Sequence, residues 1–229
     1  MKKDLSEFEK KIQIKFKDKN LLRQVFVHRS YLNENVGFDL DHNERLEFLG
    51  DAVLELIVTQ HLFENYKNPE GELTNWRAAL VKGPTLANIA KNLSMGECLY
   101  LSKGEEKTGG KSRQLILANT FEALIGAIYL DQGLEKTRDF VKKYLLSKLD
   151  EILEKKLYID PKSRLQELSQ ESIGITPFYK VLAEYGPDHA KSFTVGVHLG
   201  NKLIGQGSGS SKQSAEQSAA SNALDNWRE

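Results

Sequence analysis

Apolar side chains in the first two thirds of the chain recur at the three- and four-residue spacing of helices. This spacing places them on one face of each helix, where they can pack into a core. It predicts a chain that is helical almost throughout as far as residue 150. Clear examples are Leu21, Leu22, Val25 and Phe26, and further on Leu145, Leu149, Ile152 and Leu153.

The pattern changes in the last third of the chain. Asp160 and Pro161 are typical of a helix N-cap and first helical position, and they predict a helix that runs toward Gly174. Three segments with strand-like alternation follow, over residues 179–185, 193–199 and 202–208, the last of them interrupted by glycines. A closing helix is predicted from Ala215, Ala219, Ala223 and Trp227. The predicted order is therefore α-β-β-β-α.

These two patterns divide the chain into domains of different architecture. We predict a mainly α domain, a helical bundle, over residues 1–152, a linker over 153–160, and an α+β domain over 161–229. The chain has 229 residues, of which 40% are hydrophobic and 28% charged. This length and composition suffice for two small domains, each with its own core.

Composition and charge exclude some classes of protein but indicate no partner. Residues 1–20 mix lysines with acids, and no apolar run is long enough to span a bilayer, so we expect a cytoplasmic protein without a membrane partner. The single cysteine, Cys98, excludes an internal disulfide and is expected to fill a small space in the core. Residues 160–229 carry seven Lys/Arg against eight Asp/Glu, so net charge gives no argument for RNA binding.

A row of carboxylates lies on the helix predicted around residues 42–55. The row consists of Glu44, Glu47, Asp51 and Glu55, opposite an apolar stripe of Leu46, Leu49, Val53 and Ile57. Such a row is often only a solvated face. Here each like-charged pair at i, i+4 costs about 0.2–0.5 kcal/mol without a lysine to offset it, and Gly50 adds roughly 1 kcal/mol of helix penalty. Carboxylates without cations suit a hard divalent ion such as Mg²⁺, so we predict a metal site.

A second helix, predicted over residues 115–130, is apolar on nearly all sides, as expected for a helix in the middle of a domain. Its only charge is Glu122, and Asn119 lies one turn earlier on the same face. Burying an isolated carboxylate is costly unless it is protonated, paired or bound to metal. Two interpretations follow: an ion pair with Arg45 or Arg113, or a metal cluster shared with the carboxylate row.

The segments that carry these features resemble a known family. Residues 42–55 look like the signature of the bacterial ribonuclease III family, and residues 116–131 resemble its second catalytic helix. Residues 160–227 are similar to the double-stranded-RNA-binding domain that follows in that family. The resemblance implies a homodimer that hydrolyses double-stranded RNA with Mg²⁺, for which Mn²⁺ substitutes. Its products would have 5′-phosphates and short 3′ overhangs.

The resemblance also implies roles for individual residues of the first domain. Glu47 and Glu122 match metal ligands, and Glu122 also counts among the catalytic residues. Asp51 matches the catalytic residue beside the metal and the attacking water. Glu44 matches an auxiliary catalytic acid near the scissile strand. Phe48 matches an aromatic residue that inserts into the partner subunit, although the sequence is nearly as consistent with a buried core Phe.

Asn119 departs from the family's pattern, because the usual residue at this metal-ligating position is Asp. An amide oxygen can coordinate a metal but brings no charge, so Mg²⁺ should bind less tightly. We interpret Asn119 as a natural variant with a weaker ligand, and a deliberate substitution that blocks turnover is the alternative.

For the second domain the resemblance assigns three regions of RNA contact. Gln166 and Glu167 on the first helix would face one minor groove, and His189 in the loop 186–190 would enter the next. Lys212, at the start of the closing helix, would contact phosphates across the intervening major groove. Gln213 stands where the family often has a second basic residue, which argues against tight binding by this domain.

Three functions are consistent with these features. The first is a nuclease that processes ribosomal, transfer or messenger RNA precursors. The second is a double-stranded-RNA-binding protein in which Asn119 has weakened or abolished cleavage. The third, a structural component of a ribonucleoprotein particle, is disfavoured because the four acids Glu44, Glu47, Asp51 and Glu122 are all present.

Overall fold

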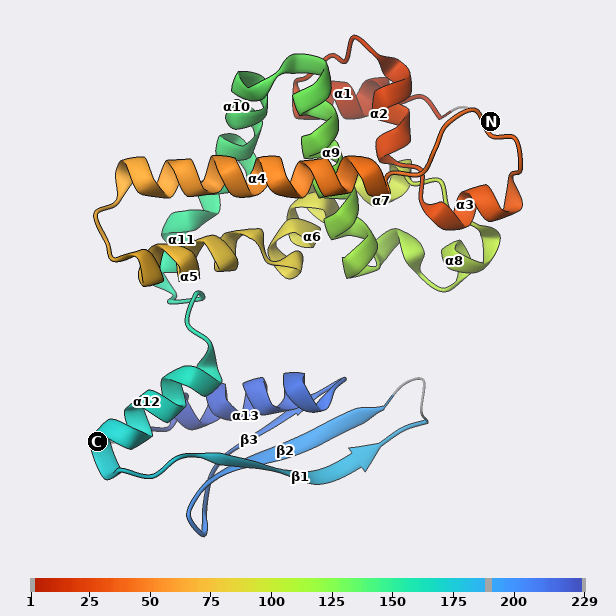
Figure 1. Cartoon of the computed structure of the whole chain (residues 1–229). Helices are drawn as coiled ribbons and strands as arrows, with labels where there is room; N and C mark the ends of the chain where they lie inside the picture. Colours follow the sequence, from red (N-terminus) through yellow and green to blue (C-terminus); the bar gives the residue numbers. More distant parts are fainter. Residues whose placement is uncertain (1–2, 188–190, 228–229) are drawn as a thin grey trace. The chain divides into compact units, whose positions relative to one another are not determined.

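The computed structural model describes residues 3–187 and 191–227, and none of the helices within them has the length and apolar character of a membrane span. The chain forms two compact units that divide between Tyr158 and Ile159 (Figure 1). The first unit is helical, and the second combines helices with a three-stranded antiparallel sheet. The predicted fold class is therefore confirmed.

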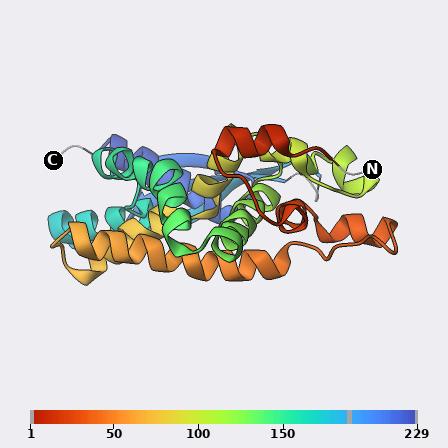
Figure 2. The same cartoon turned by 90° about the horizontal axis from the view of Figure 1, so that it is seen from above.

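The N-terminal unit is built around one central helix, α9 (Gln114–Gln132), against which α4 (Glu44–Asn65) and α6 (Gly83–Asn92) pack. Most α9 side chains are buried, as its apolar pattern predicted. Cys98 is half-buried against the same core. The other helices are α1 (Ser6–Ile12), α2 (Lys19–Val25), α3 (Arg29–Glu34), α5 (Glu70–Val81), α7 (Met95–Cys98), α8 (Lys103–Lys107), α10 (Leu134–Tyr144) and α11 (Leu149–Glu154), with short 3₁₀ turns at Gly110–Ser112 and Leu146–Lys148. Figure 2 shows α4 (orange) and α1 (red) on opposite sides of this unit.

The backbones of α4 and α9 touch at two glycines. A Cβ atom built on Gly50 would lie 1.7 Å from the backbone oxygen of Glu122, and one built on Gly126 would lie 2.3 Å from the backbone oxygen of Leu46. Any side chain at these positions would push the helices apart. From the sequence alone, the unfavourable helix propensity of Gly50 is one reason to predict a metal site. The structure corrects this interpretation, because the close packing of α4 on α9 requires glycine there.

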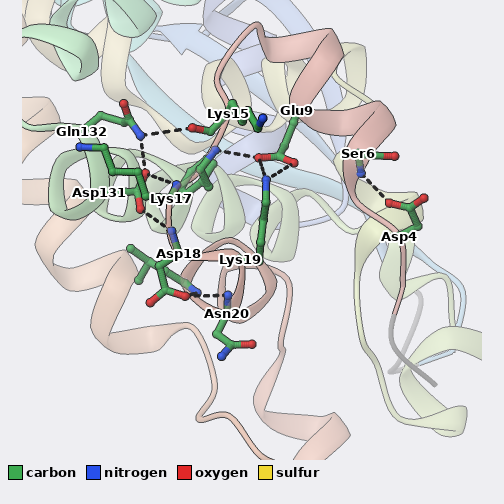
Figure 3. Close-up of polar contacts among 12 residues, drawn as sticks. Asp4, Ser6, Glu9, Lys15, Lys17, Asp18, Lys19, Asn20, Asp131 and Gln132 are labelled. Carbon is green, nitrogen blue, oxygen red and sulfur yellow. Dashed lines mark hydrogen bonds and ion pairs between the residues drawn. The ribbon is translucent and has the colours of Figure 1, made fainter.

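Asp131 fixes the N-terminal segment to the end of α9 (Figure 3). Its carboxylate accepts hydrogen bonds from the backbone N–H groups of Lys17 at 2.9 Å and Asp18 at 2.8 Å. Asp18 in turn caps α2 by accepting a hydrogen bond from the backbone N–H of Asn20 at 2.8 Å. Although burial raises the pKa of Asp131, the hydrogen bonds from Asp18 and Lys17 leave it below its ordinary value. The charged carboxylate is thus the form that holds this segment in place.

The helical unit extends into the segment predicted as a linker. Leu153 packs against the core as part of α11, and the ring of Tyr158 meets Trp76 edge-on with centroids 6.0 Å apart. Residues 153–158 therefore belong to the first unit, and the division falls near the end of the predicted linker, 153–160.

The C-terminal unit has the predicted order of elements. Its first helix begins after Asp160, whose carboxylate accepts a hydrogen bond from the backbone N–H of Ser163 at 2.9 Å. It ends at Gly174, which adopts the left-handed conformation with φ of 70°. The elements are α12 (Pro161–Ile173), β1 (Phe178–Tyr185), β2 (Ser192–Leu199), β3 (Lys202–Gly209) and α13 (Lys212–Asp225), and the strand order is β1-β2-β3.

α13 packs closely on β3 because alternate residues of that strand are glycines. A Cβ atom on Gly207 would lie 2.2 Å from the backbone nitrogen of Ala219, which is fully buried. Trp227 was predicted on this helix, but α13 ends at Asp225. The backbone N–H of Trp227 donates to the oxygen of Leu224, three residues back, so the chain has left the α-helical pattern there. Its side chain still packs against the core of this unit.

Replacing Gly50 with Ala should destabilise the N-terminal unit by about 1–3 kcal/mol or more, because the added methyl group overpacks a backbone contact. Gly71 is the matched control, since it also lies in a helix but a Cβ atom added there would meet no other part of the described chain within 4 Å. Gly71→Ala should leave stability unchanged or raise it by up to about 1 kcal/mol. Urea unfolding followed by circular dichroism measures both, and equal midpoints for Gly50→Ala and the parent would contradict the packing argument.

Candidate active site and RNA-binding surface

The four carboxylates of α4 have different surroundings. Glu44 and Asp51 are exposed, whereas Glu47 is half-buried and turned toward α9. Glu55 pairs with Arg77 of α5, with 3.3 Å between Oε2 and Nε. The predicted row is therefore not one uniform face, and Glu55 has a cation from another helix that the spacing along α4 could not reveal.

Glu47 and Asn119 connect the two helices directly. The side-chain amide of Asn119 donates a hydrogen bond from Nδ2 to Oε1 of Glu47 at 2.9 Å. Burial raises the pKa of Glu47, the bond from Asn119 lowers it, and the charges of Glu44 and Asp51 raise it again, with a net rise. The structure thus brings the predicted second helix against the carboxylate row.

Glu122 lies half-buried beside the same acids. Burial, followed by the charges of Asp51 and Glu47, raises its pKa to about 7. The alternative of an ion pair with Arg45 or Arg113 is not realised, because Arg113 pairs with Glu105 and no cation within residues 3–187 or 191–227 pairs with Glu122. Among the described residues, this carboxyl group therefore has no ion pair that would compensate its charge.

The donor set has the chemistry of a site for a hard cation. Besides burial, the charge of Asp51 raises the pKa of both Glu47 and Glu122, and the charge of Glu47 raises that of Glu122 further. A divalent cation would relieve this charge repulsion. Within the described part of the chain, no three His, Cys, Asp or Glu side chains already converge as a metal-binding group. Glu47, Asn119 and Glu122 therefore fit an ion in chemical type, and side-chain rotation would be needed to close around it.

Glu44 lies beside an arginine and a histidine, a setting that the sequence did not reveal. Its carboxylate lies 3.5 Å from Nη1 of Arg29 on α3 and 3.7 Å from Nδ1 of His42. Arg29 is fifteen residues away in sequence, so no helical spacing links the two. These neighbours distinguish Glu44 from Glu47 and Glu122, whose surroundings are acidic.

Phe48 is a surface residue, with 81% of its area exposed. The alternative of a buried core Phe is therefore wrong. α4 also exposes Leu56 and Phe63, and a hollow of about 520 Å³ lies beside Phe63 between the end of α4 and α5. α4 thus presents large apolar side chains to solvent along the helix that carries the acids.

The predicted RNA-contacting residues of the C-terminal unit are exposed where the structure describes them. Gln166 and Glu167 lie on the surface of α12. Lys212 is the first residue of α13, after the N-cap Ser211. His189 lies outside the described residues.

Comparisons with known proteins agree with these features. Residues 18–149 match the family model described as ribonuclease-III-like, and residues 161–226 match the double-stranded RNA binding motif. A ribonuclease 3 from Pelotomaculum thermopropionicum is 48% identical over 221 residues, which are 96% of this chain and 92% of that protein. A ribonuclease 3 from Roseiflexus sp. is 43% identical over 228 residues, or 98% of this chain and 96% of that protein.

A solved structure is similar to the N-terminal unit. It is the nuclease domain of ribonuclease III from Campylobacter jejuni, described for flexibility in a region involved in dimer formation. The TM-score is 0.57 and the sequence identity is 40%. The aligned region covers 62% of this chain and 95% of the Campylobacter jejuni chain. Together with the acids gathered by α4 and α9, these likenesses show that the chain belongs to the ribonuclease III family and is a ribonuclease III-type endonuclease with a double-stranded-RNA-binding domain.

Proposed function

We propose that the protein cleaves double-stranded RNA only with Mg²⁺ or Mn²⁺ bound between α4 and α9, and leaves 5′-phosphates with short 3′ overhangs. The observation that carries the proposal is Glu122, a half-buried carboxyl group whose neighbours are acids and whose pKa is raised to about 7. Ionising such a group is costly unless a cation binds beside it. We further propose a cytoplasmic role in processing ribosomal, transfer or messenger RNA precursors.

Each acid has a distinct task in this proposal. Glu47 and Glu122 would hold the ion, together with the amide oxygen of Asn119 once its NH₂ group turns away from Glu47. When bound, the ion supplies the positive charge that acidifies a nearby water and neutralises the phosphate oxygens. Asp51 is exposed beside Glu122 and would orient the attacking water through a hydrogen bond. Glu44 would act as an auxiliary acid near the scissile strand.

Asn119 leaves a second function open, a duplex-binding protein with weakened cleavage. In the absence of metal its NH₂ group is a good partner for Glu47, whereas a carboxylate there would repel it. Asn119 therefore stabilises the metal-free site and contributes no charge to the metal-bound one. We favour cleavage because all the acids are in place, with a higher demand for metal than an Asp would give.

We also propose that the protein acts as a homodimer through the N-terminal unit. The exposed Phe48, Leu56 and Phe63 of α4 support this, because large apolar side chains on a surface helix favour contact with a partner. The relative from Campylobacter jejuni has a region involved in dimer formation in its nuclease domain.

Glu122→Gln should abolish cleavage of a long RNA duplex while duplex binding persists, because it removes a proposed ligand and leaves the C-terminal unit intact. Mutation of residues that only support metal ligands costs up to about 100-fold, so removal of a ligand should lower the rate by at least that much.

The parent protein should cut duplex but not single-stranded RNA, and only with Mg²⁺ or Mn²⁺. Product sizing on gels and binding in EDTA measure both properties. An uncut duplex after long incubation of the parent with Mn²⁺ would favour the binding-protein function.

Asn119→Asp should lower the Mg²⁺ concentration for half-maximal cleavage several-fold and change the rate at saturating Mg²⁺ less. It should also lower the metal-free melting temperature, because the bond to Glu47 is replaced by repulsion, and enlarge the rise in melting temperature on adding Mg²⁺. Asn88→Asp, on the exposed face of α6, is the control. If Asn119→Asp behaves like that control, Asn119 is not beside the metal.

Phe48→Ser should weaken dimerisation without loss of folding, because the side chain is exposed within the monomer. Light scattering across micromolar concentrations measures the effect, and residues 1–158 alone should dimerise like the whole chain. Val36→Ser is the control, since Val36 is also exposed but lies outside α4. A monomeric parent protein would refute the proposed dimer.

A further inference from the structure

Lys212 already has an anionic partner within the C-terminal unit. Its Nζ lies 3.4 Å from Oε1 of Glu184, near the end of β1, and 5.6 Å from the ring centroid of Phe193 on β2. Glu184 and Phe193 face each other across the β1–β2 pair. The sheet therefore holds the ammonium group of α13 over one carboxylate and one aromatic ring.

This ion pair is accessible to water and to other anions. The Lys212 side chain is 59% exposed and that of Glu184 is 41% exposed. Exposed ion pairs contribute little to stability because water and salt screen them. An RNA phosphate can therefore displace Glu184 from Lys212.

We propose that Glu184 competes with RNA for Lys212 and thereby limits how tightly this unit binds a duplex. This inference rests on the phosphate contact that the resemblance assigns to Lys212. A phosphate that reaches Lys212 must separate it from Glu184. The released carboxylate then lies close to the RNA backbone and repels it. The contribution of Lys212 to RNA affinity is therefore the difference between its interaction energy with the phosphate and its interaction energy with Glu184.

Competition by Glu184 also changes the salt dependence of binding. A lysine that neutralises a phosphate releases a condensed cation. Each such contact steepens the slope of log affinity against log salt concentration by about 0.9. Once separated from Lys212, Glu184 attracts a cation of its own and offsets part of that release. Removing the Glu184 charge should therefore steepen the slope as well as raise the affinity, whereas a purely structural role would leave the slope unchanged.

The test is equilibrium binding of the full chain to an RNA duplex of about 16 base pairs, the span of such a domain. Fluorescence anisotropy is measured in EDTA, which prevents cleavage, over a series of KCl concentrations. Glu184→Gln should raise the affinity by up to about fivefold, the upper range for an exposed ion pair, and steepen the slope. Lys212→Ala should weaken binding and flatten the slope. In the Lys212→Ala background Glu184→Gln should give a smaller gain, because only the repulsion between Glu184 and the RNA is then removed.

Asp225→Asn is the matched control, because it removes one negative charge at the other end of α13. It should not change affinity or slope. Lys212→Ala without any effect would refute the proposed phosphate contact itself. If Lys212→Ala weakens binding but Glu184→Gln leaves it unchanged or weakens it too, the contact stands and the competition is overturned. An equal gain from Asp225→Asn would also overturn it, since net charge alone would then explain the result.

Discussion

The backbone contact of α4 and α9 at Gly50 and Gly126 is the constraint on which the N-terminal unit depends. Because neither position carries a side chain, the helices approach closely enough for Asn119 on α9 to donate a hydrogen bond to Glu47 on α4. The same approach places Glu122 beside acids of α4, whose charges raise its pKa. The packing of the helices and the candidate active site therefore depend on the same contact. A larger residue at either glycine would move the helices apart, and their acids with them.

Helix packing alone does not explain why α9 carries an acid at its contact with α4. A packed pair of helices needs small or apolar residues at the contact, and an alanine at position 122 would satisfy packing without any desolvated charge. Glu122 instead places a carboxyl group where burial and neighbouring acids oppose ionisation. Arginines near in sequence do not relieve it, because Arg113 pairs with Glu105. The unfavourable electrostatics remain in the folded chain, which is the condition under which a cation binds strongly.

Local patterns predicted the elements well, while contacts between elements could not be predicted from them. The fold class and the α-β-β-β-α order of the C-terminal unit follow from periodicity, and the motifs indicated the acids of α4 and α9. The pairing of Glu55 with Arg77 and the packing role of Gly50 depend on which helices meet, and no spacing within one helix contains that information. Trp227 was placed on α13 by its spacing from Ala223, but the chain leaves the α-helical pattern after Asp225. The exposure of Phe48 likewise required the packed structure, because an aromatic side chain on an amphipathic helix fits either face.

In both units a charged side chain to which we assign a function contacts a partner inside the chain. Glu47 accepts a hydrogen bond from Asn119, and Lys212 pairs with Glu184. Under the proposals above, each internal contact exists only in the ligand-free protein: Mg²⁺ would separate Glu47 from the amide of Asn119, and an RNA phosphate would separate Lys212 from Glu184. The strength of each internal contact would then set how much ligand is needed. The amide of Asn119 would give no charge to the metal, and the carboxylate of Glu184 would remain close to the RNA. The near-neutral charge of the chain is consistent with this arrangement, because affinity is then decided by individual residues and not by a basic surface.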